Sequence, residues 1–192
     1  MEKLKSALSF GGILSQNDID KVASNFCLKK LNASEYFLPL QKVAKEIAFV
    51  NSGILQVYST DLDGNNVTKY FIKENQFFAS LESYYSAQPT TNAIQAVVSC
   101  ELYTITFAVF EKLYAEIPNL YIFSKSITEA ILLNKIKDND FLNFGDSKTK
   151  YIEFVKRHPL LAQQVPQQQI ASYLKITPQS LSRIRKILVK RN

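Results

Sequence analysis

The stretch Thr177–Lys186, TPQSLSRIRK, carries the side chains best suited to binding another molecule. At 100° per residue on a helix, Gln179 and Arg183 lie opposite the apolar positions Leu181 and Ile184. An arginine can donate two hydrogen bonds to O6 and N7 of guanine, and a glutamine amide can pair with adenine. Hydroxyl and ammonium groups suit phosphates. The pattern predicts a helix that reads duplex DNA, with these contact residues: Thr177, Gln179, Ser180, Ser182, Arg183, Lys186 and Lys190.

The segment around this stretch is typical of a helix-turn-helix motif. Thr177 is a suitable N-cap, and Pro178 occupies the first helical position, where its missing N–H is not needed. A preceding helix begins near Gln167 and places the small residue Ala171 where the two helices cross. Lys175 occupies the turn position where glycine is common, so either the lysine adopts a strained left-handed conformation or the turn closes differently.

Charge is distributed unevenly along the chain. Residues 148–192 contain ten Lys or Arg and one acid, a net charge of +9, whereas residues 1–147 contain 13 basic and 16 acidic residues, a net charge of −3. A basic module of this kind favours a polyanionic partner. A solvated basic tail is the alternative, but the regular apolar positions in the same segment argue against it.

The elements that must position this module belong to an α+β fold. Residues 1–34 are predicted to form short helices, with Ser15 capping one of them. Residues 35–106 contain short segments rich in β-branched and aromatic residues, separated by turns such as Asn51-Ser52-Gly53. Many short strands at even spacing indicate a barrel or a sandwich of the jelly-roll type. Helices follow from residue 108, with a break at Pro118.

The long helix predicted over residues 119–144 has apolar residues on more than one face. One face could pack on the β-roll and another on a second subunit, which would give a dimer, although a helix buried within one chain has the same periodicity. The stretch 145–148, GDSK, is a predicted hinge. We therefore expect three parts: a β-roll sensor domain over residues 1–118, a dimerisation helix over 119–146, and a helix-turn-helix domain over 147–192.

Several other classes of protein are disfavoured. The sequence has no long apolar run for a transmembrane helix, and the start of the chain does not resemble a signal peptide. Cys27 and Cys100 lack metal-type spacing, which favours free thiols in a reducing cytoplasm. The single histidine, His158, lies outside the β segments, so we expect neither an enzyme nor a metal site nor a bound cofactor. A surface or helix-end position is expected for His158.

The order of elements resembles the cyclic-AMP receptor protein and fumarate–nitrate regulator superfamily of bacterial transcription factors. The resemblance covers nearly the whole chain and is most specific in residues 52–105 and 165–188, the latter reading VPQQQIASYLKITPQSLSRIRKIL. It implies a homodimer joined along residues 119–144 that binds two-fold symmetric operators, and it allows a contact with RNA polymerase. By the same likeness, Gln179 and Arg183 match the base-reading positions.

Three departures from this superfamily are visible. Members that bind cyclic AMP carry a Gly-Glu pair and an Arg-Ser/Thr pair, but here Ala79-Ser80 and Thr90-Thr91-Asn92 stand in their place. Without an arginine, the cyclic phosphate loses its charge-assisted bonds, so cyclic AMP in the usual pose is not expected. Two cysteines cannot hold an iron–sulfur cluster of the four-cysteine kind. The chain ends at Asn192, and we expect no full wing after the recognition helix.

The sequence allows two interpretations of the effector site and two hypotheses for the function. Ser80, Thr90 and Thr91 could bind an unidentified small molecule, or they could simply solvate a loop. The favoured function is a sequence-specific, dimeric DNA-binding transcriptional regulator. The alternative is a small-molecule receptor that acts through a protein partner, and salt dependence together with sequence preference would separate the two.

Overall fold

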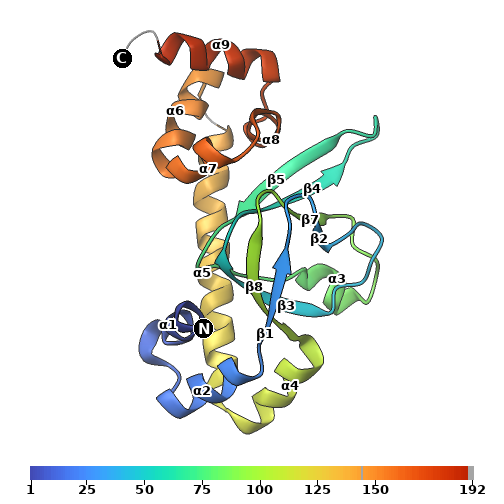
Figure 1. The fold of residues 1–192 in the computed structure, drawn as a ribbon, viewed down its shortest axis with the longest axis vertical. Helices are drawn as coiled ribbons and strands as arrows, with labels where there is room; N and C mark the ends of the chain where they lie inside the picture. The colour runs from blue at the N-terminus through green and yellow to red at the C-terminus, as the bar shows by residue number, and fades with distance from the viewer. Residues whose placement is uncertain (144, 190–192) are drawn as a thin grey trace. The chain divides into compact units, whose positions relative to one another are not determined.

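The computed structural model describes residues 1–143 and 145–189 (Figure 1). The chain divides into two compact units, the first made of Met1–Val57 and Phe71–Ile131, the second of Tyr58–Tyr70 and Leu132–Asn192. The predicted three-part division is a different partition of the chain, and it stays a prediction.

In the described residues, eight strands form two four-stranded sheets, with orders β1-β8-β3-β6 and β2-β7-β4-β5. Their bounds are β1 Cys27–Leu31, β2 Tyr36–Leu38, β3 Glu46–Ser52, β4 Leu55–Thr60, β5 Asn66–Ile72, β6 Phe77–Phe78, β7 Ala93–Ala96 and β8 Cys100–Thr106. The predicted β-roll is confirmed. Its β3–β4 turn needs glycine, because Gly53 has φ +102° and an added Cβ would lie 2.6 Å from the Ser99 carbonyl oxygen.

Several helices belong to the first unit, the last of them only in part. They are α1 Glu2–Leu8, the 3₁₀ turn η1 Phe10–Gly12, α2 Gln16–Ser24, α3 Leu81–Ser86, α4 Phe107–Glu116 and α5 Asn119–Asn143. The predicted cap at Ser15 is confirmed as a full capping box with Asp18. Inward residues of α1, α2, α4 and the start of α5 pack on Phe49 of β3 and Ile105 of β8.

The expectation of short helices throughout residues 1–34 is wrong for Cys27–Leu31, which forms strand β1. Each residue of β1 pairs with β8 in antiparallel register, from Cys27 opposite Thr104 to Leu31 opposite Cys100. The segment CLKKL contains no β-branched residue, so its own propensity does not specify a strand. Pairing with β8 decides its conformation. Strand β6 and helix α3 were also not expected from the sequence.

The second unit consists of the tip of the β4–β5 hairpin, the C-terminal half of α5 and four further helices. These are α6 Ser147–Arg157, α7 Pro159–Gln164, α8 Gln167–Tyr173 and α9 Pro178–Val189. Asp146 caps α6 by accepting a hydrogen bond from the Thr149 N–H at 2.8 Å. Phe154, Leu161, Ile170 and Leu174 are almost fully buried among these helices.

Candidate nucleic-acid interface

The turn that joins α8 to α9 is closed by the backbone of Lys175 in a left-handed conformation. Lys175 has φ +56°, its N–H bonds the Ser172 carbonyl at 3.1 Å, and the Ile176 N–H bonds the Ala171 carbonyl at 3.0 Å. These two bonds define a Schellman motif, which satisfies the last carbonyls of a helix. Of the two alternatives for this position, the strained lysine is therefore the one observed.

The start of α9 is fixed by the cap that the sequence predicts. The Thr177 Oγ1 accepts a hydrogen bond from the Ser180 N–H at 3.1 Å, and the two hydroxyl oxygens lie 2.9 Å apart. Pro178 is the first residue of the helix. The hydroxyls of Thr177 and Ser180 thus bond each other, and they hold the N-terminus of α9 in place.

The inner faces of the two helices pack as predicted. Ala171, Leu174 and Leu181 are fully buried, and Ile184 is buried except for a small fraction of its surface. Because Ala171 has only a methyl group, α8 and α9 can approach closely where they cross. Leu188, also predicted to face inward, is half-buried. The apolar periodicity of residues 170–188 therefore determines which side of α9 faces outward.

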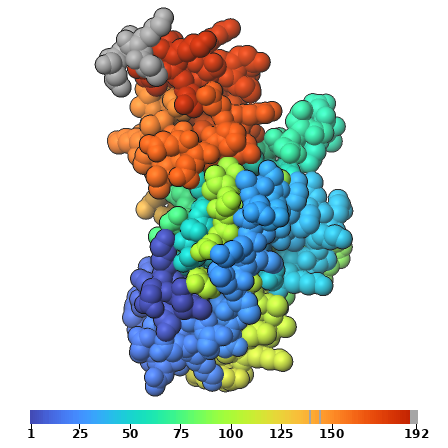
Figure 2. Space-filling view, viewed as in Figure 1, coloured from blue at the N-terminus to red at the C-terminus, as the bar shows by residue number. Residues whose placement is uncertain are grey.

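The outward side of α9 carries most of the predicted contact residues. Gln179, Arg183 and Lys186 are exposed, and Ser182 is partly exposed. Among residues 1–143 and 145–189, the structure gives the side chains of Gln179, Arg183 and Lys186 no hydrogen bond or ion pair. Figure 2 shows α9, in red, at the surface of the second unit. Lys190 lies outside the described residues.

The other basic residues of the second unit are not equivalent. The Arg157 Nε lies 2.7 Å from Glu153 Oε1, its NH1 lies 4.0 Å from Asp138, and the guanidinium stacks 5.0 Å from the Phe141 ring centre. The Arg157 guanidinium holds the pKa of Glu153 below its ordinary value. Arg157 is therefore engaged within the protein, whereas Lys156 is exposed.

His158 lies at the junction of α6 and α7, as expected for a helix-end residue, but it is not on the surface. Its side chain is only 9% exposed, its Nε2 lies 3.7 Å from Asp138 Oδ1, and its ring meets Phe154 edge to face. The described residues contain no group of three or more His, Cys, Asp or Glu placed to hold a metal ion.

Two contacts that sequence reasoning did not predict connect the β4–β5 hairpin to the helices of the second unit. The Thr68 N–H donates to the Ser172 Oγ on α8 at 2.9 Å. The Lys135 ammonium lies 3.9 Å from the centre of the Tyr70 ring, a cation–π contact. Since 104 residues separate Thr68 from Ser172, no local pattern in the sequence could have indicated their hydrogen bond.

The candidate effector residues are located around α3, and they differ in burial and in hydrogen bonding. Thr90 is buried, and its Oγ1 bonds the Asn92 N–H at 3.0 Å and the Asn92 carbonyl at 2.9 Å. Its backbone pairs with Gln41 and Lys42. Thr91 is exposed, and Ser80 is partly exposed at the start of α3. The Thr90 hydroxyl therefore stabilises the loop in which it lies.

Ser83 is a second polar residue in this region that the sequence did not reveal. It is buried, accepts the Ala44 N–H at 3.1 Å and donates to the Gln88 carbonyl at 2.7 Å. The same unit contains two aromatic pairs: Phe78 meets Phe37 edge to face, and Tyr84 stacks on Phe107. The Glu111 carboxylate accepts from the Tyr84 hydroxyl and raises its pKa to about 12.

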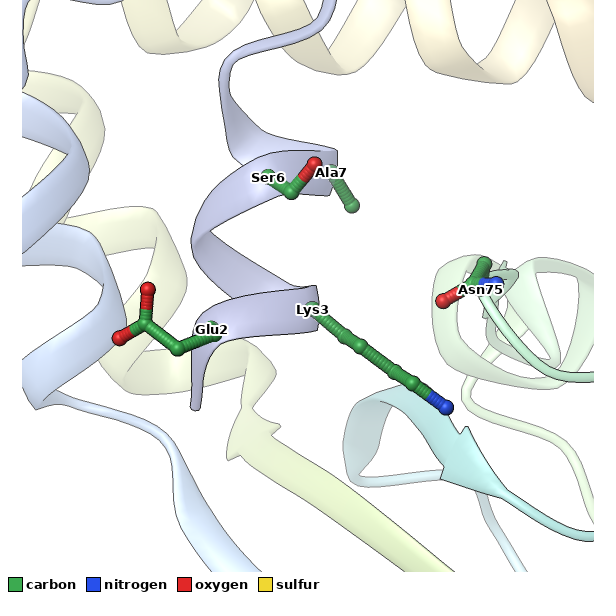
Figure 3. Close-up of a pocket in the computed structure, with 5 residues that line it drawn as sticks. All are labelled: Glu2, Lys3, Ser6, Ala7 and Asn75. Atoms are coloured by element: carbon green, nitrogen blue, oxygen red, sulfur yellow. The ribbon is translucent and has the colours of Figure 1, made fainter.

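A surface hollow of about 530 Å³ lies elsewhere in the first unit, lined by Glu2, Lys3, Ser6, Ala7 and Asn75. Figure 3 shows Lys3 extending from α1 toward the side that carries Asn75, while Glu2 points the other way. The Lys3 ammonium is paired with Glu74 at 3.0 Å and with the Asn51 carbonyl at 3.0 Å. None of the predicted effector residues lines this hollow.

Both cysteines are reduced. Cys27 is exposed and Cys100 is buried, and burial raises the pKa of the Cys100 thiol to about 11. Within the ranges that the structure describes, no helix combines the length and apolarity needed to cross a bilayer.

Comparison with known proteins agrees with this architecture. The family model described as "Cyclic nucleotide-binding domain" matches residues 28–116. No curated protein sequence matches the chain. Among solved structures, FixK2 from Bradyrhizobium japonicum has a TM-score of 0.70 at 16% identity, covering 86% of this chain and 85% of that one.

Two further structures extend the comparison. The catabolite activator protein of Thermus thermophilus has a TM-score of 0.57 at 17% identity, covering 96% of this chain and 87% of that one. The global regulator CLP of Xanthomonas campestris, described as responsive to c-di-GMP, has a TM-score of 0.70 at 13% identity, covering 92% and 93%. Residues 28–116 therefore match the cyclic nucleotide-binding domain, and the chain has the fold of these three solved proteins.

Proposed function

We propose that this protein is a sequence-specific DNA-binding transcriptional regulator that acts in the cytoplasm as a dimer. The observation that carries the proposal is the outward face of α9, where Gln179 and Arg183 lie one turn apart and exposed, with Lys186 beyond them. A helix that only served the core would not need unpaired polar and cationic side chains at this spacing. The net charge of +9 in residues 148–192 supports the same conclusion.

The proposed reading mechanism assigns different tasks to the residues of α9. Arg183 would bind guanine O6 and N7 with two parallel hydrogen bonds, and Gln179 would bond the edge of a neighbouring base. Lys186 and Ser182 would contact phosphates, which position the helix but do not read sequence. Thr177 and Ser180 would serve mainly through their mutual cap, since their hydroxyls bond each other at 2.9 Å. Lys190 would add a further phosphate contact.

The proposed dimer would form along α5. Opposite its buried face, which includes Leu120 and Phe123, the helix exposes four large aliphatic residues, each about half accessible: Ile122, Leu132, Leu133 and Ile136. We call these four residues the α5 stripe. So much exposed apolar surface on one side of a helix is typical of an interface. Two copies joined here would bind operators with two half-sites. Contact with RNA polymerase stays a prediction.

The proposed regulator would not respond to cyclic AMP in the usual pose. Residues 77–93 contain no arginine or lysine to pair with a cyclic phosphate. Thr90 is engaged with Asn92, so of the three candidate residues only Ser80 and Thr91 have hydroxyls that the described residues leave unbonded. We propose them as the remaining polar contacts for a different small effector.

The test is selection of the purified full-length protein against randomised duplex DNA, with and without added cyclic AMP. The proposal expects enrichment of a palindromic site whose half-sites lie about one helical turn apart, about 10–10.5 bp. Enrichment without cyclic AMP would support the proposal that the protein does not respond to cyclic AMP in the usual pose. Enrichment only with cyclic AMP would contradict this part of the proposal. If no sequence is enriched while binding to acidic proteins is found, the alternative function through a protein partner replaces the proposal.

A further inference from the structure

Four tyrosines gather on one surface of the first unit, where α3, α4 and the start of α5 contact one another. The rings of Tyr84 and Tyr85 on α3 lie 5.2 Å apart. The Tyr114 ring on α4 meets the Tyr121 ring on α5 at 6.2 Å. The Tyr84 hydroxyl donates to the Glu111 carboxylate, which connects α3 to α4. We call these five residues the tyrosine surface.

The two pairs of rings are close to one another and open to solvent. Burial raises the pKa of the Tyr114 hydroxyl, and the neighbouring Tyr85 and Glu111 raise it further. Tyr85 is 78% exposed and Tyr121 is 65% exposed. Tyrosine is enriched at protein interfaces, because its ring offers a large contact area and its hydroxyl can stay in water. Several exposed tyrosines around one carboxylate therefore indicate a binding surface.

The tyrosine surface is negatively charged and has no cation of its own. Residues 81–124 contain four Glu and one Lys, a net charge of −3. Glu101 and Glu116 are each paired with a lysine, whereas Glu82 and Glu111 have no ion pair in the part of the chain that the structure describes. None of the Lys or Arg side chains described there lies over one of the four rings. Because the face of an aromatic ring is also negative, the rings and the carboxylates attract the same kind of group, a cation.

Three features favour an arginine of a protein partner as the source of this cation. The two main hollows of the described chain are lined by other residues, and small molecules prefer concave sites. Arginine stacks on aromatic rings more often than lysine does, and it also pairs with carboxylates. A second copy of this chain is a poor source, because all four arginines belong to the basic module that is proposed to bind DNA: Arg157, Arg183, Arg185 and Arg191.

We propose that the tyrosine surface is a docking site for a basic segment of a protein partner, whose arginine side chains stack on the exposed rings of Tyr85 and Tyr121 and pair with Glu111. The Tyr84 hydroxyl holds the Glu111 carboxylate in place without neutralising its charge. Glu82 lies three residues before Tyr85 on α3 and supplies a second carboxylate beside that ring. The site lies within the first unit and does not depend on DNA binding.

The first experiment titrates the full-length protein, with its tyrosine rings labelled with ¹³C, with a pentapeptide of alternating glycine and arginine. The NMR signals of Tyr85 and Tyr121 are assigned by their loss in Tyr85→Leu and Tyr121→Leu, which replace mostly exposed rings and should fold. Both signals should shift in the wild type as the peptide is added. The same peptide with neutral citrulline in place of arginine should bind about fivefold more weakly or less, because the ring contact and the ion pair both lose the charge.

Single variants then locate the binding site. Glu111→Gln keeps an acceptor for the Tyr84 hydroxyl but removes the charge, and it should weaken peptide binding by about two- to fivefold. Tyr121→Leu should weaken it by a similar factor, about two- to fivefold, because a cation–π contact is lost. Tyr36→Leu removes a tyrosine of β2 that is also exposed, and this control should bind the peptide like wild type.

Four results would overturn the proposal. Equal binding of the citrulline peptide would show that no cation is selected, and unchanged affinity in Glu111→Gln and Tyr121→Leu would place the peptide elsewhere. Tetramethylammonium binding as tightly as the peptide would make the surface a site for small cations. Shifts of the same signals with protein concentration alone would show that a second copy covers it. Because the titration contains no DNA, its failure is distinct from a failure of the proposed DNA binding.

Discussion

The outward face of α9 and the segment around α3 contain similar polar side chains that are used in opposite ways. On α9, Gln179, Arg183 and Lys186 point to solvent without a partner among the described residues. Near α3, Ser83 and Thr90 are buried, and their hydroxyls bond the backbone of their own loop. A polar side chain in the first setting is available to another molecule, whereas a hydroxyl in the second stabilises the protein itself.

The two regions also depart from the superfamily's sequence pattern with different structural results. In the α8–α9 turn, Lys175 departs from the usual glycine, yet the Schellman bonds form and close the turn before α9. In residues 79–92, the charged pair of the superfamily is missing, and internal hydrogen bonds occupy part of its place. The first departure preserves geometry, and the second replaces one set of contacts by another.

The largest expected effect comes from removing the packing that orients α9. Leu174→Ala, at a fully buried position, should lower the free energy of unfolding of the second unit by about 2–5 kcal/mol. Urea denaturation followed by circular dichroism measures the change. Ile187→Ala, at a half-exposed position on α9, is the control and should change stability little. Equal losses in the two variants would contradict the assignment of inner and outer faces.

The next effect tests whether the unpaired side chains of α9 read sequence. Arg183→Ala should reduce discrimination between the selected site and a single-base variant by about 1–3 kcal/mol, because a bidentate contact to guanine is lost. Binding assays on matched duplexes at one salt concentration measure it. Lys186→Ala should instead weaken all duplexes alike and lower the salt slope by about one. An unchanged ranking of sites in Arg183→Ala would show that the register of α9 is wrong.

A third pair of variants tests the opposite use of hydroxyls near α3. Thr90→Val should destabilise the first unit by about 1–3 kcal/mol, since it leaves the Asn92 N–H without its acceptor in a partly buried place. Thr91→Val removes an exposed hydroxyl and should leave thermal unfolding nearly unchanged. If the two variants unfold at the same temperature, Thr90 is not the structural residue inferred here.

The smallest expected effect is a gain in stability. Lys175→Gly should raise the free energy of unfolding by about 1 kcal/mol, because glycine adopts φ +56° without the clash that a Cβ causes. Gln168→Gly, in the first turn of α8, makes the same substitution at helical φ and should lower stability. Thermal denaturation of both variants measures the changes in stability. A lower stability of Lys175→Gly would show that the left-handed backbone of Lys175 is not strained.

Features that depend on neighbouring residues were accessible from the sequence. The caps at Ser15 and Thr177, the turn at Gly53 and the inner faces of α2 and α9 follow from local patterns, and the structure has them. Strand β1 and the buried hydrogen bond between Ser83 and Ala44 were not accessible. They depend on partners distant in the chain, such as β8 for β1 and Ala44 for Ser83, which no local propensity encodes.

The division into two units has a consequence for building hybrid regulators. The chain passes from one unit to the other three times, after residues 57, 70 and 131. A chimaera that exchanged all residues before a single junction near residue 146 would place a foreign hairpin where Thr68 bonds Ser172. A transplantable module should therefore keep residues 58–70 together with 132–192, as two inserted segments rather than one.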